Sequence, residues 1–119
     1  MATQPRVDRI ETIARLNDRA RHGLDPTARI VFTRNCLGAF CDPDTIDVVM
    51  VQAQLLGAFR RCSFSPDSPE RDFAAITFRD RKVWLKIDCY DGALEFGSDD
   101  PADASVTTRV ITILLPEDY

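Results

Sequence analysis

The stretch that decides the fold runs from Phe73 to Tyr90 and contains two strand-like segments joined by a short charged turn. The first segment is Phe73-Ala74-Ala75-Ile76-Thr77-Phe78, the turn is Arg79-Asp80-Arg81, and the second segment is Lys82-Val83-Trp84-Leu85-Lys86-Ile87-Asp88-Cys89-Tyr90. Segments rich in β-branched and aromatic residues on either side of a short turn predict a β-hairpin.

Side chains alternate in character along the second segment of this hairpin. Because successive side chains of a strand point to opposite faces, one face is expected to carry Val83, Leu85, Ile87 and Cys89. The other face is expected to carry Trp84, Lys86, Asp88 and Tyr90. This second, polar and aromatic face either meets solvent or lines a groove.

Three further segments are predicted to be strands. Residues Arg29 to Arg34 combine β-branched and aromatic side chains, and Leu94 to Phe96 can form a short strand after the Asp91-Gly92 turn. The segment Arg109 to Leu115 is apolar on both faces. We therefore expect that last strand to be central in the sheet and covered on each side.

Two helices are predicted ahead of the hairpin. The first spans residues 5–22, with a stripe of Ile10, Ile13, Leu16 and Ala20, with Pro5 in its first turn, with His22 in its last turn and with Gly23 as its C-cap. The second is expected to start at Asp42-Pro43 and to end at Arg60-Arg61. Its buried stripe is predicted to be Ile46, Val49, Met50, Ala53 and Leu56.

These elements predict an α+β fold with two helices packed on a mainly antiparallel sheet of about four to five strands. A chain of 119 residues with 45% hydrophobic and 29% charged residues fits a single folded domain over residues 1–119. No apolar run approaches the length of a membrane span, and the first residues lack the apolar stretch of a signal peptide. We therefore expect a cytoplasmic protein with no membrane contact.

Charge is distributed unevenly along the chain. Residues 1–34 hold seven arginines and four acidic residues, a net charge of +3. Residues 88–119 hold eight acidic residues and Arg109 as the lone cation, a net charge of −7. The simplest interpretation is that solvated helix sides and loops differ in sign, and the functional interpretation is a basic face and an acidic face on one small domain.

Neither the cysteines nor the acidic residues form a recognisable metal motif. Cys36, Cys41, Cys62 and Cys89 contain no CxxC pair, so reduced and buried thiols are expected. A divalent-ion site drawn from Asp88, Asp91, Glu95, Asp99, Asp100 and Asp103 is conceivable, but the spacing fails the EF-hand pattern. We expect Asp99-Asp100-Pro101, with Asp103 and Ser105, to cap a turn or short helix instead, and we expect no metal or cofactor.

Five segments together resemble the bacterial domain of unknown function 3768. They are Ile13 to Arg19, Pro69 to Phe73, Lys86 to Asp91, Gly97 to Asp103, and Thr108 to Tyr119. The resemblance implies a small stand-alone bacterial protein, frequently found in accessory or mobile-element settings, with no assignable activity. Arg71 and Ala74 stand where the family usually has histidine and glycine, so a mechanism that needs that imidazole is not implied here.

Three functions follow as hypotheses. The first is a non-enzymatic protein-binding or inhibitory module that acts through the acidic C-terminal third, because a carboxylate-rich surface can engage a basic partner or imitate nucleic-acid phosphates. A mobile-element setting would suit an inhibitor of a host defence protein. The candidate binding residues are Trp84, Lys86, Asp88, Tyr90, Asp91, Asp99, Asp100, Asp103 and Arg109.

The second hypothesis is a small enzyme whose site contains Lys86, Asp88, Tyr90 and Asp91, with Arg109 nearby, because an amine and a carboxylate two residues apart on one strand face could exchange a proton. No nucleophile elbow, phosphate loop or HExxH sequence supports it, so no residue is assigned as catalytic. The third hypothesis is DNA binding through Arg9, Arg15 and Arg19 of the first helix, which the net charge of −4 disfavours. Self-association is left open.

Overall fold

The computed structural model describes residues 5–119 and contains one four-stranded sheet. The strands are β1 (Arg29–Phe32), β2 (Phe73–Phe78), β3 (Arg81–Tyr90) and β4 (Thr108–Leu114). Their order is β1-β4-β3-β2, with β1 parallel to β4 and the other neighbours antiparallel. This arrangement confirms the predicted α+β class with a mainly antiparallel sheet.

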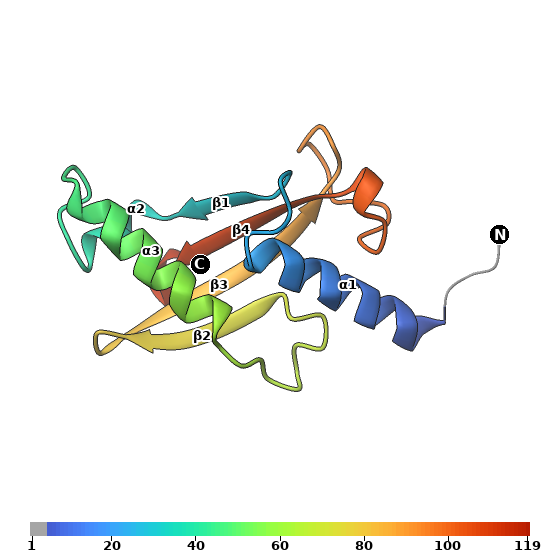
Figure 1. Cartoon of the computed structure of the whole chain (residues 1–119), viewed down its shortest axis with the longest axis horizontal. Coiled ribbons are helices and arrows are strands. Elements are labelled where there is room, and N and C mark those ends of the chain that lie inside the picture. The colour runs from blue at the N-terminus through green and yellow to red at the C-terminus, as the bar shows by residue number, and fades with distance from the viewer. Residues whose placement is uncertain (1–4) are drawn as a thin grey trace.

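Three helices accompany the sheet, and the two long ones lie across the same face of it (Figure 1). They are α1 (Arg6–Arg21), α2 (Arg34–Gly38) and α3 (Asp47–Arg60), and two short 3-10 turns, η1 (Ala104–Val106) and η2 (Pro116–Asp118), flank β4. The C-terminal ends of α1 and α3 meet, where Arg21 Nη1 donates to the carbonyls of Phe59 at 2.7 Å and Arg60 at 3.2 Å. A guanidinium placed there compensates the negative end of the α3 dipole.

The hairpin forms as predicted, with a turn one residue shorter than expected. Phe78 pairs with Arg81, which leaves Arg79 and Asp80 as a two-residue turn with φ of 47° and 67°. Two consecutive positive φ angles are typical of the type I′ turn, whose twist matches that of the flanking strands. Burial along β3 alternates as predicted, with Val83, Leu85 and Ile87 buried between partly exposed neighbours.

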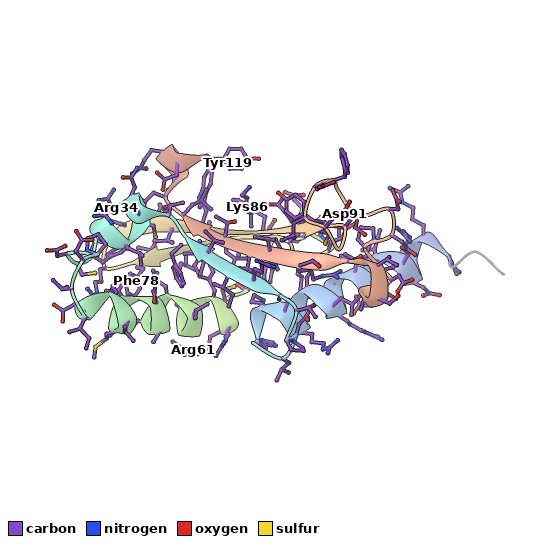
Figure 2. All side chains as sticks on the ribbon, turned by 90° about the horizontal axis from the view of Figure 1, so that it is seen from above. Arg34, Arg61, Phe78, Lys86, Asp91 and Tyr119 are labelled. Atoms are coloured by element: carbon purple, nitrogen blue, oxygen red, sulfur yellow. The ribbon has the colours of Figure 1, made fainter. Side chains whose placement is uncertain are left out.

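The central position predicted for the last strand is confirmed, but its coverage on both sides is wrong. Strand β4 lies between β1 and β3. The two long helices, α1 and α3, lie on one side of the sheet, as the side view shows (Figure 2). On the opposite face Val110 is partly exposed beside its partner Asp88, and Leu114 is buried beside its partner Trp84.

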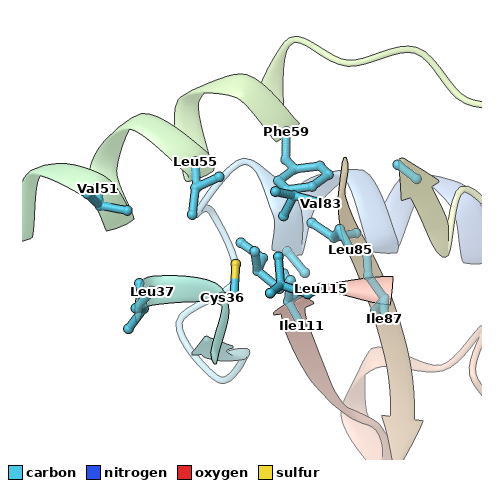
Figure 3. Packing of buried hydrophobic residues seen from close by; sticks show 13 residues of the cluster. Cys36, Leu37, Val51, Leu55, Phe59, Val83, Leu85, Ile87, Ile111 and Leu115 are labelled. Atoms are coloured by element: carbon cyan, nitrogen blue, oxygen red, sulfur yellow. The ribbon is translucent and has the colours of Figure 1, made fainter. Parts of the chain in front are cut away.

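The core lies between α3, α2 and the covered face of the sheet. Val51, Leu55 and Phe59 of α3 point toward Val83 and Cys36, with Leu85, Ile111 and Leu115 nearby (Figure 3). All of these side chains are buried. Close packing of this kind is the main source of stability in a chain of this size.

The second helix differs most from its prediction. It begins at Asp47 rather than at Asp42-Pro43, and residues 42–46 form turns in which Thr45 Oγ1 donates to the Asp42 carbonyl. Most of the predicted stripe is also wrong, because Val51, Leu55 and Phe59 are buried whereas Ile46, Val49, Met50 and Ala53 are exposed. Of its members, Leu56 packs partly buried against the core. Both sets recur at helical spacing, so periodicity alone could not decide which one faces the sheet.

Two smaller predictions also fail. The strand predicted to reach Arg34 ends at Phe32, and residues 34–38 form α2, with the Thr33 side chain capping its start by accepting a hydrogen bond from the Cys36 N–H. Residues 94–96 form no strand, and only an isolated bridge between Tyr90 and Gly97 extends β3. A five-residue helix has too few turns to produce a periodic signal.

Candidate binding surface

The sheet face opposite the helices carries most of the predicted site residues. Strand register brings Trp84, Lys86, Asp88 and Tyr90 of β3 beside outward residues of the neighbouring strands, which include Val31, Phe73, Ala75, Val110 and Thr112. We call these nine residues the open face. Lys86 stands on this side of the sheet, away from α3 and its Arg61 (Figure 2).

Tyr119 extends the open face and is counted with it below, because its ring forms a row with the rings of Phe73 and Trp84. The ring centroids of Phe73 and Trp84 are 5.2 Å apart and those of Trp84 and Tyr119 are 5.9 Å apart, both in edge-to-face geometry. Such pairs are favourable because the positive edge of one ring meets the negative face of the next. Tyr119 is nevertheless 81% exposed and Phe73 37% exposed, so the row presents apolar surface to its surroundings.

The chain end that supplies Tyr119 is fastened by the residue before it. The Asp118 carboxylate accepts hydrogen bonds from Thr33 Oγ1 at 2.7 Å, from Asn35 Nδ2 at 2.9 Å and from the Leu115 N–H at 3.0 Å. The Thr33 and Asn35 hydrogen bonds lower the pKa of Asp118, because they favour its charged form. These contacts fasten the chain end that carries Tyr119 at the same end of the sheet as Trp84, which pairs with Leu114.

Lys86 and Asp88 form an ion pair on the open face. Lys86 Nζ lies 3.1 Å from Asp88 Oδ2, and both side chains are more than one third exposed. The hydrogen bond to Asp88 raises the pKa of Lys86, which stabilises the ammonium form. A lysine that serves as a general base needs the opposite shift.

The segment from Asp91 to Asp103 lies at the end of β3, and we call it the acidic loop. Asp91 Oδ1 accepts from the Glu95 N–H at 3.0 Å, and Asp103 Oδ1 accepts from the N–H and hydroxyl of Ser105 at 2.9 and 2.6 Å. Asp103 is the N-cap of η1, which confirms the predicted capping role, and the Ser105 hydrogen bonds lower its pKa. Several of these acids therefore shape the loop.

The basic first helix and the acidic loop meet each other. Arg9 of α1 forms an ion pair with Asp100, and Arg15 Nε lies 3.4 Å from Glu11. Part of the charge asymmetry in the sequence is therefore neutralised within the chain. The arginine stripe predicted for DNA binding is interrupted by these carboxylates.

Arg109 does not belong to the open face. It lies on the covered side, where it is 1% exposed, and its Nε donates to Asn17 Oδ1 at 2.7 Å while its Nη2 donates to the Pro101 carbonyl at 2.6 Å. Asn17 Nδ2 in turn donates to the Glu70 carbonyl at 2.9 Å. Arg109 is therefore separated from the Lys86 and Asp88 pair. It is a buried residue whose hydrogen bonds, with those of Asn17, link α1, β4 and two loops.

A second cluster of charges, which sequence reasoning missed, joins α1 to the loop before β2. Arg71 Nη2 lies 2.7 Å from Asp18 Oδ2, and Arg21 Nη2 lies 2.8 Å from Asp18 Oδ1. Asn17 and Arg21 continue the i+4 spacing set by Ile13, and Asp18 follows the buried Ala14 at i+4, which is the signal that could have placed them on the inward side of α1. The Arg109–Asn17 cluster and the Asp18–Arg71 cluster together connect four of the five segments that resemble the family. These are Ile13 to Arg19, Pro69 to Phe73, Gly97 to Asp103, and Thr108 to Tyr119.

Away from the open face, a hollow of about 440 Å³ lies beside α2 and η2. Its lining includes Arg34 and Arg81, whose guanidinium groups form ion pairs with Asp44 at 3.0 Å and Glu117 at 3.1 Å. Within residues 5–119, no group of three or more histidine, cysteine or acidic residues is arranged to hold a metal ion. No helix in the same range is long and apolar enough to cross a membrane.

Comparison with known proteins gives one match. No curated protein and no solved structure matches the chain significantly. A family model described as a protein of unknown function (DUF3768) matches residues 49–118, a range that includes most of α3 and all of β2, β3 and β4. The chain therefore belongs to the DUF3768 family of proteins of unknown function.

Proposed function

We propose that this chain is a non-enzymatic protein-binding module of the cytoplasm whose recognition surface is the open face together with the acidic loop. The partner is a protein segment that presents apolar and basic side chains. In a mobile-element setting, inhibition of a basic, nucleic-acid-binding host defence protein is the form of binding that fits this surface.

The observation that carries the proposal is the aromatic row on a sheet face that neither long helix of residues 5–119 covers. Phe73, Trp84 and Tyr119 are preorganised by mutual ring contacts, so little side-chain entropy is lost when a partner packs on them. Aromatic residues are enriched at the centres of protein interfaces, where they supply much of the binding energy. The Lys86 and Asp88 ion pair adds directional polar groups beside the row.

Charge in the acidic loop supports a basic partner. Glu95 and Asp99 are exposed, and neither forms an ion pair with any residue in the range 5–119. They differ from Asp100 and Asp103, which are engaged by Arg9 and Ser105. Unpaired carboxylates at the end of the open face would accelerate association with a basic partner more than they would tighten the complex.

The two other sequence hypotheses find less support in the contacts. Lys86 is held in its ammonium form by Asp88, which disfavours a proton-transfer role. Arg9 and Arg15 are engaged by carboxylates, so a DNA-binding role would rest on Arg19 and a few neighbours. Strongly salt-dependent retention of the chain on DNA would favour the DNA-binding hypothesis over ours.

The experiment is affinity capture from the native host with variants that change one surface at a time. The test variant combines Phe73→Ser with Tyr119→Ala, and the control is Leu24→Ala, a similarly exposed apolar residue outside the open face. We expect a partner that binds the wild type and the control but binds the test variant at least about tenfold more weakly. Equal binding to all three proteins would refute the open face as the recognition surface.

A second double variant tests how much the charge of the acidic loop contributes to association. Glu95→Gln with Asp99→Asn should slow association with the captured partner at low salt, and the difference should fade as salt screens the charges. Asp103→Asn is an unsuitable substitute because it also removes the cap of η1. An association rate that is unchanged at low salt would show that the acidic loop does not contribute.

A further inference from the structure

The outward side of α3 presents an apolar stripe that no element in residues 5–119 covers. Its members are Ile46, Val49, Met50 and Ala53, and we call them the α3 stripe. Ile46 is 85% exposed, Val49 61% and Met50 63%. They recur at i, i+3, i+4 and i+7, on the side of the helix opposite the buried Val51, Leu55 and Phe59. A helix that is apolar on both sides requires two packing partners.

The α3 stripe is distinct from the open face. Helix α3 with its Arg61 lies on one side of the sheet, and Tyr119 of the aromatic row lies on the other (Figure 2). A partner bound to the open face would therefore leave the α3 stripe uncovered. Large apolar side chains exposed together on one side of a helix are a feature of interaction surfaces.

Charged residues at the two ends of α3 indicate what packs there. Asp47 begins the helix and Arg61 follows its last residue, and neither forms an ion pair with any described residue. They are 14 positions apart, which is nearly four turns, so both lie on the same side of the helix, roughly 21 Å apart. A second α3 laid antiparallel against the first would place each Asp47 opposite the other copy's Arg61.

The sizes of the side chains along the stripe fit the same arrangement. The bulky members Ile46, Val49 and Met50 occupy the N-terminal half, whereas Ala53 and Gly57 occupy the C-terminal half. Two antiparallel copies would therefore set bulky residues against small ones at both ends, which permits close helix packing. The Arg61 guanidinium lies beside Gly57, where an added Cβ would be 3.3 Å from Arg61 Nη1, so the cation stands next to the stripe.

We propose that the α3 stripe is the interface of a two-fold symmetric homodimer in which the α3 helices of two copies pack antiparallel. The partner is a second copy because the surface is complementary to itself in charge and in size, which is the property that a two-fold interface requires. A contact built on one helix of 14 residues is at the small end of specific interfaces, so a dimer that dissociates in the micromolar range is expected.

Sedimentation equilibrium of the full chain tests the pairing through a charge-swap cycle. Asp47→Arg alone and Arg61→Asp alone each replace two attractive contacts per dimer with repulsive ones, so each should weaken dimerisation about tenfold or more. The double variant Asp47→Arg with Arg61→Asp restores opposite charges and should recover most of the wild-type affinity. Recovery is specific to the antiparallel arrangement, because parallel helices would keep like charges together.

A second set of variants tests the stripe itself. Met50→Lys should abolish the dimer, and Leu24→Lys, which places the same charge on a similarly exposed residue elsewhere, should leave it intact. Circular dichroism and thermal melts at low concentration establish that each variant is folded. A wild-type chain that is monomeric up to about 500 μM would overturn the proposal, since weak specific dimers form below that concentration. A dimer that is insensitive to Met50→Lys, or a double variant as weak as the single ones, would overturn it as well.

Discussion

The buried contact between Arg109 and Asn17 makes a sharp prediction for stability. The Arg109 guanidinium is almost completely buried, and its Nε has Asn17 Oδ1 as a partner at 2.7 Å. The Asn17 side chain also donates to the Glu70 carbonyl at 2.9 Å. Asn17→Ala therefore removes one side chain but leaves two polar groups, one of them charged, without that partner.

The expected cost follows from those two losses. An unsatisfied buried donor costs about 1–3 kcal/mol and more when it is charged, and the lost carbonyl contact adds about 1 kcal/mol. We expect Asn17→Ala to lower the free energy of unfolding by about 3 kcal/mol, which is about 12 °C in Tm for a domain of this size. In a background with Arg109→Met the guanidinium is absent, so the same substitution should cost only about 1 kcal/mol.

Urea unfolding followed by the fluorescence of Trp84, the one tryptophan of the chain, measures all four proteins of this double-mutant cycle. The coupling energy between Asn17 and Arg109 should be about 2 kcal/mol. A coupling below about 0.5 kcal/mol would refute the reasoning, because it would mean that Arg109 finds an equivalent partner when Asn17 is removed.

Three further predictions concern acid stability, thiol reactivity and the hairpin turn. Burial by itself would raise the pKa of Asp18, but hydrogen bonds from Arg71 and Arg21 outweigh it and lower the pKa. This carboxylate therefore contributes stability that is present above about pH 4 and is lost as the pH falls through the lowered pKa, so urea titrations should show a smaller acid loss in Asp18→Asn. Burial raises the pKa of Cys36 to about 11, so a thiol reagent near neutral pH should modify Cys36 only after unfolding; mass spectrometry showing rapid modification of the folded chain would contradict this. Asp80→Gly should stabilise the chain by about 0.5–1 kcal/mol, because Asp80 has a positive φ in a type I′ turn, and an unchanged Tm would argue against strain there.

Much of the sheet could be predicted because its pattern is local. Alternation along β3 identifies the two faces of the strand from adjacent residues, and the apolar character of β4 indicates its central position. The capping role of Asp103 is local as well, since its carboxylate bonds a residue two positions away. Such features can be predicted without knowing how the rest of the chain folds.

The errors arise where two local interpretations are equally good. Helix α3 carries two apolar stripes, and which of them packs on the sheet depends on the direction in which the chain leaves α2 and reaches β2. Arg109 begins a predicted strand beside polar neighbours, so local pattern groups it with Lys86 and Asp88 in one candidate binding site. Its strand register puts it instead opposite Cys89, on the covered face.

The sequence by itself determined the α+β class, the hairpin and the two faces of β3, and it contains the segments that identify the family. Only the tertiary structure decided three points: that the long helices of residues 5–119 leave one face of the sheet open, that Arg109 is buried, and that the α3 stripe points outward. The physical reason is that alternation and capping are set by neighbours along the chain. Burial is set by segments that are distant in the sequence and pack against a residue in the folded chain. Those contacts decide which way a side chain faces at a strand end or on a helix with two apolar sides.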